Sequence, residues 1–170
     1  MTPRFIFIIL LFSFSILISC GTRENDSAIV RKPGKEDMEE LNRNFIQKDK
    51  ERIQNYIERK KLNMIETPTG LWYKVNEEGT GDFFADGDHI NMKYDCYLLD
   101  GTLCYSSEKT FILGKTGIEA GLYEGMKMLR PGSEAIFILP PFLAYGLLGD
   151  NNKIPPRSVI VYYVKVMETQ

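Results

Sequence analysis

The sequence predicts an α+β fold, built from several antiparallel strands and one short helix. Short runs rich in β-branched and aromatic residues recur between residues 67 and 170, and Gly, Pro or Asp-Gly turns separate them. One stretch of that region, from Ile118 to Leu129, has apolar residues at helical spacing and stops at Arg130-Pro131-Gly132. Several strands with a single short helix define the α+β class.

The chain begins with a pattern typical of a secretory signal peptide. Arg4 precedes an apolar run from Phe5 to Ile18, and this run is shorter than the ~20 residues of a comfortable membrane-spanning helix. The run ends in a sequence that resembles the bacterial lipobox, Leu17-Ile18-Ser19-Cys20-Gly21. We therefore expect a lipoprotein signal peptide over residues 1–19 and a lipid on Cys20. An ordinary cleaved signal that contains Cys is the alternative.

A lipid on Cys20 would anchor the protein to a membrane, since each buried methylene contributes ~0.8 kcal/mol. The lipobox resemblance implies a cell-envelope protein of a Gram-negative bacterium. Residue 21 is Gly and not the Asp that commonly retains lipoproteins at the inner membrane, which favours the outer membrane, facing the periplasm. Residues 20–34 are polar, contain Pro33-Gly34 and are expected to form a flexible tether.

The composition argues against nucleic acid as a partner. The formal net charge is −2, and the isoelectric point lies near 5.6, whereas nucleic-acid-binding domains carry a basic surplus. Without the signal peptide, the chain has the length of one domain plus an extension. Hydrophobic residues make up 44% of the sequence, which is enough for a packed core.

Residues 35–66 are expected to form a helical arm that projects from the main domain. No Pro or Gly occurs from Lys35 to Lys61, and apolar residues fall roughly on one helical stripe, which the wholly polar segment 47–52 interrupts. The arm is therefore one long helix or two shorter ones. Two roles stay open for residues 35–61, namely homodimerisation or docking of a partner, and a solvated spacer. The stripe consists of Met38, Leu41, Phe45, Ile46, Ile53, Tyr56 and Ile57.

The remaining residues, 67–170, form the predicted main domain. Alternating apolar and polar residues mark a half-buried strand from Ile90 to Leu98, and Asp100-Gly101 is a strong hairpin signal. The other strands are expected at Leu71–Val75, Leu103–Tyr105, Phe111–Gly114, Ala135–Leu139 and Val159–Val166.

Two proline-rich loops, at Pro140-Pro141 and Pro155-Pro156, flank a Gly-rich segment near the end of the chain. Rigid loops with aliphatic and aromatic side chains favour an apolar cleft over an acid–base site. A β-rich core with proline-punctuated loops is the alternative. His89 is the only histidine and lies in a polar turn, so no Ser-His-Asp set or metal cluster can be assembled from it. We expect neither a metal nor a cofactor.

Residues 67–170 resemble the FKBP-type peptidyl-prolyl cis-trans isomerases. The resemblance implies a twisted antiparallel sheet wrapped around one short helix, and isomerase activity on X-Pro bonds of polypeptide clients. It rests on motifs in the order and spacing of that family: Tyr94, Asp100-Gly101, Phe111-x-Leu113-Gly114, Gly121-Leu122-Tyr123-Glu124-Gly125-Met126, Gly132, Ala144-Tyr145-Gly146 and Ile154-Pro155-Pro156.

The whole chain further resembles the gliding-motility-associated FKBP-type lipoproteins of Bacteroidetes. This second resemblance rests on the lipobox, on Arg31-Lys32-Pro33, on the charged helical arm and on Thr69-Gly70-Leu71-Trp72-Tyr73. It implies a membrane-tethered isomerase that serves the motility machinery, and a partner from that machinery is one candidate for residues 35–61 beside a second copy of the chain.

The family resemblance also implies roles for single residues. Tyr145 would donate its hydroxyl to the bound amide, and Tyr94 would be the pocket tyrosine of the hairpin; both are assigned to catalysis. Glu119 stands where the family presents a backbone N–H to the ligand carbonyl. The apolar walls would come from Phe111, Ile118, Ile154 and Tyr162.

Three departures from the family concern the substrate-binding pocket. Leu122 replaces a floor tryptophan, and Cys104-Tyr105 replaces a Phe-Asp pair, so a wall phenyl and a carboxylate are lost. The enlarged pocket should bind prolyl ligands more weakly. A weak or inactive FKBP-fold binding or assembly module therefore stays open, as does a general periplasmic folding helper. Trp72, the only tryptophan, is expected to pack in the core.

Cys96 and Cys104 are expected to remain unbridged. A two-residue turn at Asp100-Gly101 pairs Tyr97 with Cys104 and Cys96 with Tyr105. The two thiols would then point to opposite faces of the hairpin, with Cys104 lining the pocket and Cys96 on the other face.

Overall fold

The computed structural model describes residues 34–167, and from Lys35 onward the chain forms one compact unit. The expected signal peptide over residues 1–19 and the expected lipid site Cys20 lie outside the described residues, as does nearly all of the expected tether. Among residues 34–167, no helix is both long enough and apolar enough to span a membrane.

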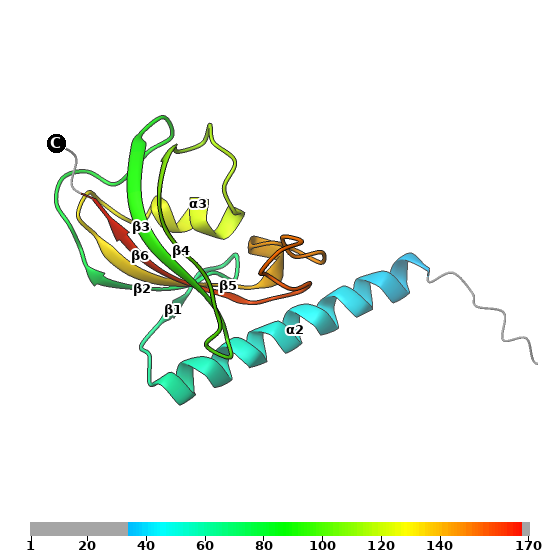
Figure 1. The fold of residues 1–170 in the computed structure, drawn as a ribbon. Coiled ribbons are helices and arrows are strands. Elements are labelled where there is room, and N and C mark those ends of the chain that lie inside the picture. Colours follow the sequence, from blue (N-terminus) through cyan, green and yellow to red (C-terminus); the bar gives the residue numbers. More distant parts are fainter. Residues whose placement is uncertain (1–33, 168–170) are drawn as a thin grey trace, which may run out of the picture. The chain divides into compact units, whose positions relative to one another are not determined.

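The described residues form a six-stranded sheet in the order β1-β2-β5-β6-β3-β4, and every pairing is antiparallel (Figure 1). The predicted α+β class is confirmed. The helices are α2 (Lys35–Lys60), α3 (Ala120–Met126) and the 3-10 turn η2 (Pro141–Leu143). The strands are β1 (Ile65–Glu66), β2 (Trp72–Glu77), β3 (His89–Leu98), β4 (Leu103–Ile112), β5 (Glu134–Leu139) and β6 (Ile160–Val166).

The sheet separates two apolar layers, with α3 on one side and α2 on the other (Figure 1). Side chains alternate along β5, so Phe137 and Leu139 pack in the layer of α3, whereas Ile136 and Ile138 pack in the layer of α2. Because both faces of β5 are covered, its sequence is a continuous apolar run and does not alternate with polar residues.

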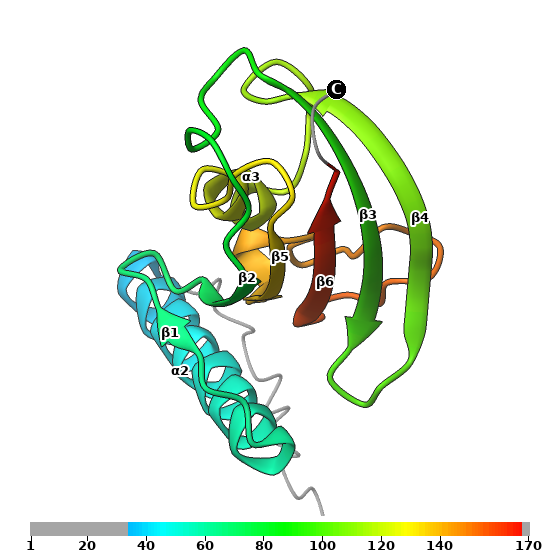
Figure 2. The ribbon, with the colours of Figure 1, turned by 90° about the vertical axis from the view of Figure 1, so that its left-hand side faces the viewer.

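Strands β3 and β4 form a long curved hairpin (Figure 2), and its register differs from the predicted one. The predicted strand 103–105 and the first two residues of the predicted strand 111–114 belong to one strand, β4, whereas Leu113 and Gly114 form the turn after it. Cys96 pairs with Tyr105 as predicted, but Tyr97 pairs with Leu103, so Cys104 is an extra residue in a β-bulge. The two-residue turn was wrong as well, because Leu98 N donates to Thr102 O at 3.0 Å across a three-residue connection.

The bulge changes the direction of one thiol. Cys96 and Cys104 are both buried in the apolar layer that contains α3, so their predicted separation on opposite faces is wrong. The extra residue shifts the alternation of β4 by one, which turns Cys104 to the side of Cys96. Both thiols are nevertheless free, as predicted.

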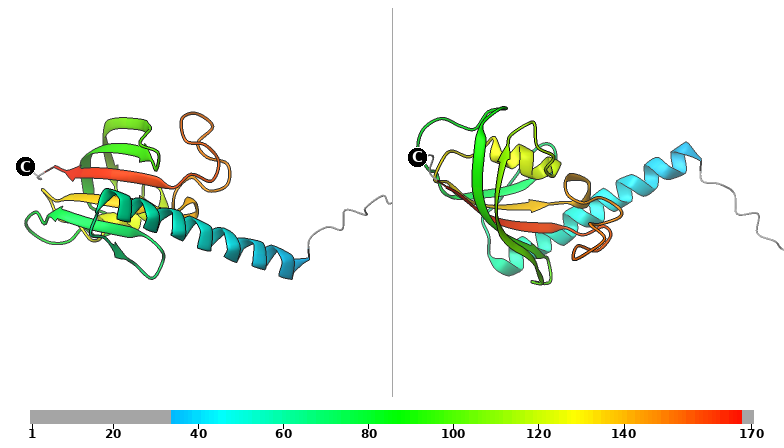
Figure 3. Two further views of the ribbon diagram at one scale, coloured as in Figure 1. Left: turned by 90° about the horizontal axis from the view of Figure 1, so that it is seen from below. Right: turned by 45° about the horizontal axis from the view of Figure 1, so that its top comes forward.

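Helix α2 is one continuous helix whose second half lies along the sheet, while its first turns extend beyond the sheet (Figure 3). The predicted projection from the domain therefore holds only for the start of the helix, where residues 35–44 are exposed. Its second half packs against β5 and β6 through Ile53 and Tyr56, which are 1% and 4% exposed. The helix ends at Lys60, and Ile65–Glu66 is strand β1 and not part of the helical arm predicted over residues 35–66. Trp72 packs in this layer, as expected for a core residue.

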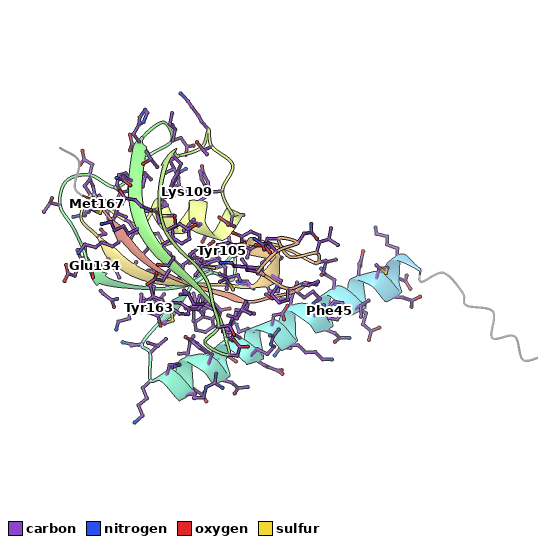
Figure 4. All side chains as sticks on the ribbon, in the orientation of Figure 1. Phe45, Tyr105, Lys109, Glu134, Tyr163 and Met167 are labelled. Carbon is purple, nitrogen blue, oxygen red and sulfur yellow. The ribbon has the colours of Figure 1, made fainter. Side chains whose placement is uncertain are left out.

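The polar middle of α2 contains a buried charge. Asp49 is 4% exposed and accepts hydrogen bonds from Arg157 Nη2 at 3.0 Å and Arg52 Nη1 at 3.3 Å. The guanidinium of Arg157 also lies 3.5 Å from the centre of the Phe45 ring, on the stretch of α2 seen in Figure 4. The segment that interrupts the apolar stripe therefore attaches α2 to the loop before β6.

Helix α3 packs tightly on β5 through two glycines. A Cβ at Gly121 would lie 2.6 Å from Leu139 Cγ, and a Cβ at Gly125 would lie 2.7 Å from Phe137 Cε1. Glycine inside a helix costs about 1 kcal/mol relative to alanine. The close approach of α3 to the sheet explains why these positions hold glycine.

Candidate functional site

The residues expected to form the prolyl pocket come together on the side of the sheet where α3 lies. They are contributed by β3, β4, the start of α3, the two proline-rich loops and β6. Phe111, Leu122, Ile154 and Tyr162 are buried, whereas Tyr94, Ile118 and Tyr145 are half-buried and reach the surface. We call these seven residues the site cluster.

Two tyrosines of neighbouring strands form the centre of the site cluster. The rings of Tyr94 and Tyr162 meet edge to face, with centroids 5.7 Å apart and an interplanar angle of 63°. Tyr162 is 2% exposed. Its burial, followed by the nearby charge of Glu119, raises its pKa, so the phenol stays protonated and acts as a hydrogen-bond donor.

The Tyr162 hydroxyl connects Tyr145 to Glu119. Tyr162 donates to Glu119 Oε1 at 3.1 Å, and the hydroxyls of Tyr145 and Tyr162 lie 3.3 Å apart. A phenol has one proton, so with Tyr162 donating to Glu119, Tyr145 is the donor in the second bond. The hydroxyl that we expected to meet a substrate amide is thus engaged by Tyr162. Sequence reasoning assigned Glu119 only a backbone role and missed this side-chain contact.

The tyrosines of the site are neutral at physiological pH. Burial, and next the nearby Glu119 carboxylate, raise the pKa of Tyr145. Burial and the charge of Glu119 raise the pKa of Tyr94 in the same direction. None of these phenols is poised to exchange protons near pH 7, so the geometry fits binding and positioning better than acid–base catalysis.

A carboxylate borders the site, although the sequence comparison with the family predicted its loss. The Tyr105 hydroxyl donates to Asp150 Oδ2. Asp150 Oδ1 accepts the N–H groups of Ile154 at 2.8 Å and Asn152 at 2.9 Å. Asp150 therefore supplies a carboxylate from the loop before β6 to Tyr105 of β4, whose position Figure 4 shows. The signal available in the sequence was Asp150 followed by Asn residues, which is a pattern typical of a side-chain-capped turn.

Cys104 lies beside Tyr105 where the family has a wall phenyl. It is 2% exposed, and its Sγ lies 3.6 Å from Lys153 O and 3.9 Å from Thr102 O. The thiol therefore contacts the loop that contains Ile154. Lys153 Nζ lies 5.1 Å from the centre of the Tyr105 ring and places a positive charge on this side of the site.

Backbone hydrogen bonds join the two proline-rich loops and so fix Tyr145 and Ile154. Gly146 N donates to Pro141 O at 2.8 Å, which closes the chain around Tyr145. Arg157 N donates to Gly146 O at 3.1 Å, and Asp150 N donates to Ile154 O at 3.1 Å. These hydrogen bonds join the two loops into one structure. Tyr145 directly precedes the bonded Gly146, and Ile154 itself accepts one of the bonds.

A sheet with a short helix on one side, and aromatic residues gathered beneath two linked prolyl loops, defines the class of FKBP domains. Residues 81–167 match the family of FKBP-type peptidyl-prolyl cis-trans isomerases, and the chain belongs to this family.

Curated relatives support this assignment. The chain is 35% identical over 107 residues to a protein of Neisseria meningitidis described as a probable FKBP-type peptidyl-prolyl cis-trans isomerase, FkpA. It is 32% identical over 105 residues to the FKBP-type isomerase FkpA of Escherichia coli. Each match covers 60% of this chain but only 39% and 38% of the relatives, so the chain spans about two fifths of their length.

Solved structures show the same fold. The crystal structure of FkpA from Escherichia coli aligns with a TM-score of 0.62 at 23% identity, covering 99% of this chain and 82% of that one. The crystal structure of AtFKBP13 aligns with a TM-score of 0.58 at 23% identity, covering 64% of this chain and 99% of that one. At these identities the likeness concerns the fold alone.

Proposed function

We propose that the chain catalyses cis–trans isomerisation of X-Pro bonds in polypeptides of the cell envelope. The observation that carries the proposal is the convergence of Tyr94, Phe111, Tyr145, Ile154 and Tyr162 in one cluster. These residues come from segments far apart in the sequence, and membership of the isomerase family supports the same activity.

Isomerisation of an X-Pro bond requires only rotation about the amide bond. Resonance gives the amide bond a rotation barrier of roughly 18–20 kcal/mol. The planar amide is more charge-separated than the twisted transition state, so apolar surroundings disfavour the planar form relative to the twisted one. Phe111, Ile154 and the Tyr162 ring supply such surroundings. This mechanism requires no nucleophile, metal ion or titrating base.

We further propose that a lipid on Cys20 tethers the isomerase to the outer membrane, where it faces the periplasm and serves gliding-motility machinery. The lipobox pattern before Gly21 motivates the tether. The resemblance of the whole chain to FKBP-type motility lipoproteins motivates the client machinery. In this arrangement residues 20–34 would link the lipid to α2.

A direct assay tests the proposed activity. The full-length chain, purified in mild detergent, should accelerate the cis-to-trans relaxation of short peptides with different residues before proline. Rates equal to the uncatalysed relaxation for every peptide would contradict the proposal, provided that circular dichroism shows folded protein.

One observation favours the second candidate function, a binding or assembly module with little catalysis. The Tyr145 hydroxyl lies 3.3 Å from the hydroxyl of Tyr162, which donates to Glu119, so Tyr145 would have to leave this bond to meet a substrate carbonyl. Such a module would bind prolyl peptides without accelerating their isomerisation. Measuring binding and isomerisation on the same peptides separates the two functions.

A further inference from the structure

The most unusual group in the site is the carboxylate of Glu119. Glu119 directly precedes α3, and its backbone carbonyl accepts the first-turn N–H of Tyr123 at 2.9 Å. The side chain is half-buried and reaches Tyr162, which is 2% exposed. An anion therefore lies against the aromatic centre of the site cluster, which is otherwise apolar or phenolic.

Nothing in the described part of the chain neutralises this charge. None of the ion pairs among residues 34–167 includes Glu119. Its bond from Tyr162 is a neutral donor bond, and such a bond satisfies a lone pair without compensating the charge. After burial, the charge of Glu119 is the largest influence that raises the pKa of Tyr94 and of Tyr162. The field of this carboxylate thus extends across the site.

The second carboxylate at the site, that of Asp150, adds to the negative charge. Asp150 accepts the Tyr105 hydroxyl and adds a second negative charge on the side of β4. Lys153 is a cation on that side, but it is exposed and its Nζ lies over the Tyr105 ring, 5.1 Å from the ring centre. A positively charged substrate could therefore form an ion pair with the Glu119 carboxylate beside the site cluster.

We propose that Glu119 makes the site selective for prolyl segments with a lysine or arginine next to the proline. The cationic side chain would pair with the Glu119 carboxylate while the prolyl ring packs on the site cluster. This inference rests on the proposed function and names the class of polypeptide that the same site prefers.

The test uses the full-length chain in detergent and one peptide frame, in which Lys, Arg, Leu or Glu stands directly before or after proline. We expect kcat/KM to be about fivefold higher for the Lys and Arg peptides than for the Glu peptide, as for a partly solvated ion pair. Added salt should reduce this ratio, because it screens the pair.

Two matched variants assign the preference. Glu119→Gln removes the charge but keeps a side-chain oxygen that can accept the Tyr162 hydroxyl, and should bring the ratio close to one. Glu124→Gln removes the same charge from α3 outside the site, where Glu124 accepts Thr69 Oγ1 at 2.8 Å and 2.6 Å. This control should keep the wild-type ratio.

The outcomes separate the inference from the function on which it rests. Isomerisation without a cationic preference, or a preference that Glu119→Gln retains, overturns the inference and leaves the proposed function in place. If no peptide is isomerised, the proposed function fails. In that case calorimetry measures the affinities of the same peptides. Tighter binding of the Lys and Arg peptides that Glu119→Gln abolishes supports the inference, whereas equal affinities for all peptides overturn it.

Discussion

Arg157 Nη2 lies 3.0 Å from Asp49 Oδ2 and joins the middle of α2 to the loop before β6. The backbone N–H of the same arginine donates to Gly146 O, directly after Tyr145. One residue therefore connects the helix, the loop of Tyr145 and the segment that leads into β6. The helix is thus part of the support of the site, in addition to covering the sheet.

Replacing this arginine should weaken the fold. Arg157→Ala leaves the buried Asp49 carboxylate with Arg52 alone, so we expect the free energy of unfolding to fall by about 2 kcal/mol. Arg52→Ala is the matched control, because Arg52 pairs with the same carboxylate but its own side chain is 53% exposed. This variant should lower the free energy of unfolding by less than about 1 kcal/mol. Urea unfolding measures both, and equal losses would contradict this assignment.

Tyr145→Phe should reduce activity and spare the fold. The ring stays in the site cluster, and only the hydroxyl bonded to Tyr162 is removed. We expect kcat/KM for prolyl peptides to fall about two- to tenfold, the value of one hydrogen bond. Tyr163→Phe, on the opposite face of β6, should leave kcat/KM unchanged. An unchanged kcat/KM in the Tyr145 variant would exclude its hydroxyl from the reaction.

The two described thiols should react only after unfolding. Cys96 and Cys104 are buried and free, so a thiol reagent should modify neither in the native protein within the time that it modifies both in denaturant. Mass spectrometry of the modified peptides reads the result. A Cys96–Cys104 disulfide in protein prepared without reductant would contradict this expectation.

The buried thiol of Cys96 should make the protein less stable at alkaline pH. Burial raises its pKa from 9.0 to about 12, so the folded state keeps the proton to higher pH than the unfolded state does. The contribution of this thiol to stability is complete below pH 9 and is lost as pH rises from 9 towards 12. Urea unfolding at several pH values should show the decline, and Cys96→Ala should make it shallower.

Gly125→Ala should destabilise the protein although alanine favours helices. The added Cβ would lie 2.7 Å from the Phe137 ring. We expect a net loss of about 1–2 kcal/mol, because overpacking exceeds the gain in helix propensity. Gly117→Ala is the control, since a Cβ there would meet no atom within 4 Å. Thermal unfolding should separate the two variants, and similar melting temperatures would contradict the close contact of α3 with β5.

Cys20→Ala tests the membrane tether. We expect the variant to lose acyl labelling and any processed protein to leave the membrane fraction, because the cysteine thiol is the attachment point of the lipid. Fractionation after labelling with a radioactive fatty acid measures both effects. Acyl labelling equal to that of the wild type would refute the tether.

Local patterns predicted the elements that depend on local periodicity. The apolar run of β5, the alternation of β3 and the strand-to-helix change near Ile118 all agree with the structure. The predicted pairing register of the β3–β4 hairpin was wrong by one residue, because a bulge depends on how two strands twist and not on their composition. Because of this extra residue, Cys104 lies on the predicted pocket side together with Cys96, whose predicted position on the opposite face is wrong.

Long-range polar contacts could not be predicted from the sequence. Asp49 lies in a segment that looks fully solvated, and its partner Arg157 is 108 positions away. In the site, the sequence identified Glu119 and Tyr162 separately, but nothing local indicated that their side chains bond to each other. Asp150 was missed for the same reason, since its contact with Tyr105 depends on how a loop folds back over β4.

Strand β6 is the last of the described elements, yet it lies at the middle of the sheet, between β5 and β3. Without it, the described strands separate into two pieces, β1-β2-β5 and β3-β4, and Ile53 and Tyr56 of α2 lose much of their apolar contact. During synthesis or export, the domain can therefore complete its core only after residue 166 has emerged. Until then the aliphatic faces of α2 and β5 are exposed together, and this interval is when the chain most needs protection from aggregation.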